Sequence, residues 1–224
     1  MNFIDFAILA AAWTGTPPVQ ELVVNGGFDT DLSGWTLTPN PPTTITWDNG
    51  TALLARNDAT DSSNGNYLYQ NIPVVSGRQY KIEAQWKGDL LNGGTGRNWA
   101  EVFVGFQSSP TGMSGSIEYK KATDGGPNEY PQPWDWESIL LSPDGGPEDG
   151  IYTATNSYMT IAFNLGGRAG VGPGYYNVDN VSVVEASPCS EIDLNDDCVL
   201  DWLDIEVFVA DWLTCNRDPA SECW

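Results

Sequence analysis

The sequence predicts an all-β protein built as a sandwich of two sheets. Its 224 residues include 24 Gly and 15 Pro, enough turn-forming residues to separate many short strands. About ten segments alternate apolar and polar residues, as strands with one buried face do. Hydrophobic residues make up 41% of the chain, which is enough for a sizeable core. These observations favour a sandwich with turn signals between its strands.

The clearest predicted strand is 78–87, where Tyr80, Ile82, Ala84 and Trp86 alternate with polar residues. The predicted strands are, in order, 21–25, 43–47, 51–55, 66–72, 78–87, 99–106, 136–141, 157–164 and 175–184. Glycine-rich stretches at 88–98 and 122–135 are expected to be long loops at the rim of the sandwich, where binding residues often lie.

Composition shifts divide the chain into four parts. We expect a helix at 1–13, a linker at 14–20, the sandwich at 21–186 and a separate tail at 187–224. The linkers are suggested by TGTPP at 14–18 and ASP at 186–188.

Charge and composition exclude several classes of function. The net charge of -21 argues against nucleic-acid binding and against attachment to anionic membranes, and the absence of histidine removes Ser-His-Asp triads and most zinc sites. No apolar run is long enough to cross a membrane. The segment 3–13 lacks a basic start and contains Asp5, so we do not expect it to be a signal peptide.

All four cysteines lie in the tail, which suggests disulfides and an extracellular location. Three pairings are open among them. These residues are Cys189, Cys198, Cys215 and Cys223.

The tail also contains a calcium-loop pattern, DLNDDCVLDWLD at 193–204. Oxygen-bearing side chains occupy loop positions 1, 3, 5, 9 and 12, and position 7 would offer a backbone carbonyl, which is EF-hand spacing. Position 12 is Asp instead of Glu, and position 6 is Cys instead of Gly. The predicted ligands are Asp193, Asn195, Asp197, Val199, Asp201 and Asp204.

This loop and the apolar helix after it resemble a type I dockerin repeat. Residues 2–13 (NFIDFAILAAAW) align with 201–212 (DWLDIEVFVADW) and match the second half of such a repeat. The resemblance implies calcium binding and docking to a cohesin-like protein. The two apolar faces would otherwise pair with each other, within one chain or head to tail into filaments. The predicted assembly interface is Phe3, Phe6, Leu9, Trp13, Trp202, Ile205, Phe208, Val209 and Trp212.

The middle of the chain starts with LVVNGGFDTDLSGWTL (22–37) and ends with GYYNVDNVSVVEA (174–186). Together with 67–88 and 159–167, these segments resemble the jelly-roll carbohydrate-binding modules of the family 4/9/22 type, which are galactose-binding-like. The resemblance implies a structural Ca²⁺ held by Asp29 and Asp179, which tie the first and last strands together. The alternative is that both are ordinary surface carboxylates.

The same resemblance implies glycan binding, with sugar rings stacked on aromatic side chains. The candidates lie in the predicted loops and on the polar face of 78–87; core packing is the alternative for each tryptophan. They are Gln85, Trp99, Tyr130, Trp134 and Trp136.

Asn49 and Asn180 begin N-glycosylation sequons, and otherwise they are turn residues. An enzyme would need two carboxylates across a cleft, and Glu83 with Glu101 on neighbouring strands is one such pair. With 30 acidic residues, such pairs arise by chance, so we expect no catalysis. Two hypotheses remain: an extracellular assembly subunit that docks through its ends, or a glycan-targeting module of a dockerin-bearing polysaccharide-degrading enzyme.

Overall fold

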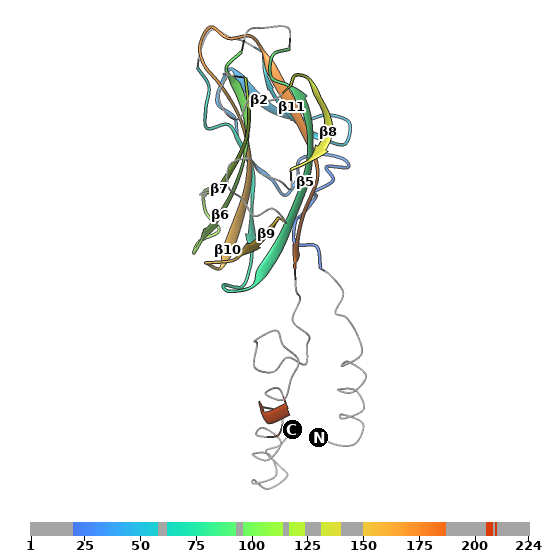
Figure 1. The fold of residues 1–224 in the computed structure, drawn as a ribbon, viewed down its shortest axis with the longest axis vertical. Coiled ribbons are helices and arrows are strands. Elements are labelled where there is room, and N and C mark those ends of the chain that lie inside the picture. Colours follow the sequence, from blue (N-terminus) through green and yellow to red (C-terminus); the bar gives the residue numbers. More distant parts are fainter. Residues whose placement is uncertain are drawn as a thin grey trace. The chain divides into compact units, whose positions relative to one another are not determined.

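The structure is a computed structural model, and it describes residues 20–57, 62–92, 96–113, 117–123, 131–139, 150–186, 205–207 and 209. Residues Glu21–Ala186 form one compact unit. Within it, two antiparallel sheets face each other, as Figure 1 shows, and the predicted sandwich is confirmed.

The first sheet has five strands, and the second has six. In spatial order, the five are β1 (Thr36–Thr38), β4 (Tyr67–Pro73), β10 (Tyr158–Gly167), β6 (Asn98–Gln107) and β7 (Ile117–Ala122). The six are β2 (Thr43–Trp47), β3 (Ala52–Arg56), β11 (Gly174–Glu185), β5 (Gln79–Asp89) and β8 (Trp134–Ser138), with β9 (Ile151–Thr153) also paired to β5.

Strand alternation builds the core between the sheets. In β5, Tyr80, Ile82, Ala84 and Trp86 are buried and belong to one apolar cluster, as the two-residue period predicts. The central strand β10 departs from this pattern, because its residues from Met159 to Gly167 are all buried, on both faces of the sheet. Something other than the core therefore covers its outer side.

Most predicted strands exist, with ends shifted by a few residues. Segment 21–25 is different: it contributes only an isolated bridge from Glu21 to Val184. The strands β1, β7 and β9 were not predicted. Segments 88–89 and 134–135 belong to β5 and β8 instead of to rim loops.

A charged pair joins the edge strands β7 and β8, with its lysine buried and its glutamate partly exposed. The Lys121 side chain is 4% exposed, and its Nζ lies 2.6 Å from Oε1 of Glu137. The same ammonium lies 5.1 Å from the ring centre of Trp134 and 5.7 Å from that of Trp86. The pair therefore joins the edges of the two sheets and places a cation against two aromatic faces.

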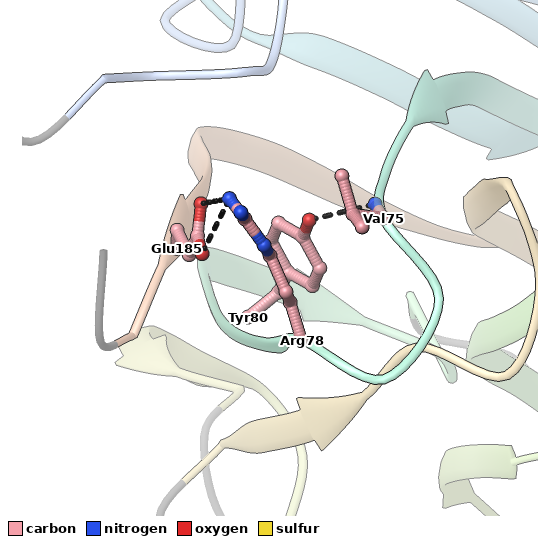
Figure 2. Close-up of polar contacts among 4 residues, drawn as sticks. All are labelled: Val75, Arg78, Tyr80 and Glu185. Atoms are coloured by element: carbon pink, nitrogen blue, oxygen red, sulfur yellow. Dashed lines mark hydrogen bonds and ion pairs between the residues drawn. The ribbon is translucent and has the colours of Figure 1, made fainter. Parts of the chain in front are cut away.

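The chain enters and leaves the sandwich at neighbouring points. Glu21 accepts hydrogen bonds from the Val183 amide at 2.9 Å and from the Ser182 hydroxyl at 2.6 Å. At the end of β11, Glu185 pairs with Arg78 at 3.2 Å, and nearby the Tyr80 hydroxyl accepts a hydrogen bond from the Val75 amide (Figure 2). The last strand is therefore fastened to the chain entry through Glu21 and to the residue before β5 through Glu185.

The described residues of the predicted tail helix, Ile205, Glu206, Val207 and Val209, are helical. The calcium loop 193–204, all four cysteines, residues 1–13 and the other interface residues lie outside the described residues. The terminal helical appendage therefore stays a prediction. In the described part of the chain, no helix is long and apolar enough to cross a membrane.

Candidate functional site

The outer face of the five-stranded sheet is the best candidate for a binding surface. On β6, Ala100, Val102 and Val104 belong to the core, so the residues between them project outward. Cross-strand register places residues of β4 and β10 beside them. We define the aromatic face as Tyr67, Tyr69, Trp99 and Phe103.

Trp99 lies against the glycine directly opposite it. A Cβ atom built on Gly166 would stand 2.2 Å from Cε2 and 2.3 Å from Nε1 of Trp99. Only a residue without a side chain leaves room for the indole to rest on β10. The strand thus seats one half-buried aromatic ring on the outer surface of the sheet.

Tyr67 and Phe103 continue this surface. Their ring centres are 6.0 Å apart, and the rings meet edge to face at 73°. Both are half-buried, while Tyr69 beside them is buried. Between these rings, Ala162 and Asn164 on β10 have no exposed surface, so the aromatic rings cover the small residues of the central strand.

Polar groups beneath the rings are held in place by one another. The Asn164 side chain donates to Oε2 of Glu101 and, at 3.1 Å, to the Asn64 side chain, and it accepts from the Asn66 amide at 2.9 Å. Glu101 is only 7% exposed. These buried, partnered groups hold the strands beneath the rings in fixed positions.

A second network fastens the loop after β6 across the face. The Asn71 side chain donates to the carbonyls of Pro110 at 2.7 Å and Gly112 at 2.8 Å. Its oxygen accepts from Gln107 at 3.0 Å and from the Thr160 hydroxyl at 2.6 Å. This loop therefore reaches from β6 over β10 to β4, and it bounds the aromatic face at one end.

The four described residues among the five predicted glycan-binding residues are divided between the two sheets. Trp99 lies on the aromatic face, whereas Gln85 and Trp136 belong to the other sheet. There, Gln85 accepts a hydrogen bond from Asn180, and the ring centre of Trp136 lies 4.8 Å from Nζ of Lys87.

The structure places neither of the remaining two predicted residues on the aromatic face. Trp134 packs against the core, with its ring centre 6.0 Å from that of Trp86, and Tyr130 lies outside the described residues. The placement of Glu83 and Glu101 on neighbouring strands is wrong, because Glu83 is on β5 of one sheet and Glu101 is on β6 of the other.

Sequence reasoning missed Tyr67, Tyr69 and Phe103. Each alternates with core residues on its strand, so an aromatic residue on either face gives the same apolar signal. The order of β4, β10 and β6 brings them together, and that order joins strands far apart in the sequence. The one available signal was Gly166–Gly167, since glycine inside a strand often marks a close approach.

The predicted sandwich calcium ligands lie near each other. The loop at 25–29 packs on a bulge of β11: the Val181 amide donates to the Gly26 carbonyl at 2.9 Å, and a Cβ atom on Gly26 would stand 1.9 Å from the Val181 carbonyl oxygen. Partial burial raises the pKa of Asp179, the charge of Asp29 raises it further, and a hydrogen bond from the Asn180 amide opposes both. Two carboxylates that repel each other suit a divalent cation.

Three acidic, cysteine or histidine side chains do not cluster anywhere in the part of the chain that the structure describes. A cation bound by Asp29 and Asp179 would therefore need backbone carbonyls or water as further ligands.

The asparagines of both sequons have positive φ angles. Asn49 is exposed in the turn between β2 and β3 with φ of 47°, and Asn180 is exposed at the β11 bulge with φ of 51°. Whether either carries a glycan stays a prediction.

No protein-family model and no curated protein matches the sequence. Several solved structures resemble the fold. One titled "CBM4 structure and function" is 15% identical, covers 73% of this chain and 99% of its own, and has a TM-score of 0.48.

Two further structures have lower TM-scores. A CBM61 module in complex with β-1,4-galactotriose is 14% identical, with 74% and 99% coverage and a TM-score of 0.40. The CBM22-1–GH10 modules of xylanase 10B from Clostridium thermocellum, complexed with xylohexaose, are 18% identical, with 74% and 28% coverage and a TM-score of 0.40. At these values, the function of this chain has to be argued from its own residues.

Proposed function

We propose that this chain is a non-catalytic glycan-binding module, and that the outer face of its five-stranded sheet is the binding surface. The observation that carries the proposal is the set of three half-buried aromatic rings, Tyr67, Trp99 and Phe103, gathered on one face over fixed polar groups. Sugar rings present apolar C–H faces to such rings and hydroxyl groups to the polar partners around them.

A binding role also fits Glu101, the carboxylate nearest the rings. It is nearly buried and accepts a hydrogen bond from Asn164, so it is held as a fixed acceptor. An acid–base carboxylate would instead need a second carboxylate across the scissile bond. Glu83, considered beside it on the sequence alone, belongs to the other sheet.

Affinity electrophoresis of the full chain in gels containing xylan, β-glucan or pectin tests the proposal. We expect retardation by at least one polysaccharide, and we expect Trp99→Ala and Phe103→Ala to abolish or strongly reduce it. Trp136→Ala on the other sheet is the matched control and should migrate like the parent chain. Retardation that survives both face variants but is lost in Trp136→Ala would place binding on the six-stranded sheet and overturn the proposal.

A structural Ca²⁺ between Asp29 and Asp179 is part of the same proposal. The effect of the Asp29 charge on Asp179 supports it, because a bound cation would remove the repulsion and fix the 25–29 loop to β11. Thermal unfolding with and without CaCl₂ tests it: we expect a higher Tm with calcium in the parent chain and no shift in Asp29→Asn.

The terminal segments are a second candidate for function, supported by the spacing of acidic residues in 193–204 and by the internal repeat. They would dock through calcium to each other or to a cohesin-like partner, outside the cell. Light scattering before and after EDTA tests assembly. We expect the particle size to fall on chelation, and an unchanged size would count against docking by these ends.

A further inference from the structure

Two arginines stand side by side at the end of the aromatic face. Arg97 precedes β6, and Arg168 follows β10. The last register pair of these strands is Asn98 with Gly167, directly beyond Trp99 with Gly166. The Arg168 amide donates to the Arg97 carbonyl at 3.3 Å, and both residues are exposed. Figure 1 shows β6 and β10 in the same sheet.

Neither arginine has an ion pair within the described part of the chain. The other cations whose side chains the structure describes do have partners. Lys81 pairs with Glu83, Arg78 with Glu185 and Lys121 with Glu137, Lys87 lies over Trp136, and Arg56 donates to Asn98 and to the Arg168 carbonyl.

Two arginines without ion pairs are unexpected in a chain so rich in acidic residues. Asp and Glu outnumber Lys and Arg by 30 to 9, so an exposed cation should easily find an acid nearby. Instead, two exposed arginines at neighbouring backbone positions have no ion-pair partner among the described residues. An anion bound between them would be attracted by both charges.

The backbone also holds Arg97 in an unusual conformation. Its φ is 111°, which residues with side chains rarely adopt, and its amide donates to the Thr123 hydroxyl at 2.7 Å. Such strain persists where the surrounding structure imposes it, and it is frequent in binding sites.

We propose that Arg97 and Arg168 bind an anionic substituent, a carboxylate or a sulfate ester, of a glycan chain whose neighbouring sugar stacks on Trp99. This inference rests on the proposed function and narrows its ligand to acidic polysaccharides. Guanidinium groups match the geometry of carboxylate and oxyanion groups through paired N–H donors. The seated indole next to them supplies the apolar contact with the sugar ring.

Matched ligands test the proposal on the full chain. Polygalacturonate is compared with its methyl ester, and dextran sulfate with dextran, by affinity electrophoresis at about 0.15 M salt, where charges beyond roughly 8 Å are screened. We expect tighter binding to at least one anionic polymer than to its neutral counterpart, and the two pairs tell a carboxylate from a sulfate.

The double variant Arg97→Gln/Arg168→Gln should lose about tenfold in affinity for that anionic polymer, as expected for charge-assisted hydrogen bonds. Lys81→Gln/Lys87→Gln removes the same charge from the other sheet and should bind like the parent chain.

Equal loss in both double variants would mean that only net charge matters, and it would overturn the inference. Retention of neutral polymers alone, sensitive to Trp99→Ala but not to the arginine variant, would also overturn it while leaving glycan binding intact. Absence of binding to every polymer would instead overturn the proposed function itself.

Discussion

Substituting Gly166 should disable the aromatic face without removing any aromatic residue. In Gly166→Ala, the new methyl group would stand 2.2, 2.3 and 2.5 Å from Cε2, Nε1 and Cζ2 of Trp99. Ordinary carbon contacts lie at about 3.5–4.0 Å, so the indole has to move by more than about 1 Å. Because Trp99 is half-buried, the ring has solvent to move into, and its seat on β10 is lost.

We expect this variant to lose about 1–2 kcal/mol of binding free energy, five- to thirty-fold in affinity, which is typical of losing one aromatic anchor. Affinity electrophoresis or calorimetry with the polysaccharide that the parent chain binds measures the loss. Alanine loses less conformational entropy in a strand than glycine does, which stabilises the folded state by about 0.5–1 kcal/mol. This gain opposes the loss of the indole contact, so the Tm should change little.

A double-mutant cycle shows whether Gly166→Ala acts through Trp99. If the substitution only displaces the indole, then Gly166→Ala/Trp99→Ala should bind no worse than Trp99→Ala alone. Parent-like affinity in Gly166→Ala, or losses that simply add in the double variant, would refute this reasoning.

Three other perturbations have defined outcomes. The pKa of Asp179 in the folded protein is raised above its usual 3.8, so the metal-free protein should lose stability as pH rises from about 4 through that raised value. Calcium should reverse this trend. Thermal melts of Asp179→Asn should show neither the pH trend nor the calcium effect. Glu137→Gln should cost about 3 kcal/mol in urea unfolding because it removes a charged partner of the buried Lys121. Lys121→Met should cost less because Glu137 is 45% exposed; equal costs would contradict this account. Asp193→Ala should abolish any calcium-dependent change in particle size, and a retained change would exclude that loop as its cause.

The sandwich was predictable because most strands bury one face. In β5 the two-residue period places every core residue, and turn residues mark its ends. Strand β7 was missed because its inward residue Lys121 is charged, and charge normally indicates an outward position. Three-residue strands such as β1 and β9 are too short to show any period.

The candidate site was harder to predict because it depends on which strands become neighbours. Trp99 was identified from its glycine-rich surroundings, but nothing local distinguishes Phe103 from a core residue. The outward residues of β10, such as Ala162, are as buried as its core residues, so burial patterns predicted from sequence do not mark this face. Strand order, which sequence reasoning did not supply, decides the site.

The bridge between Glu21 and Val184 has a mechanical consequence. Glu21 and Val184, near the two ends of the sandwich, lie on antiparallel segments. Tension applied through the two ends would therefore break the contacts between these segments one at a time, instead of loading all of them together. The Glu21 contacts with β11 would rupture first, and the 25–29 loop would follow. In single-molecule stretching, we expect this module to yield at low force, while the aromatic face on the opposite sheet stays intact until later.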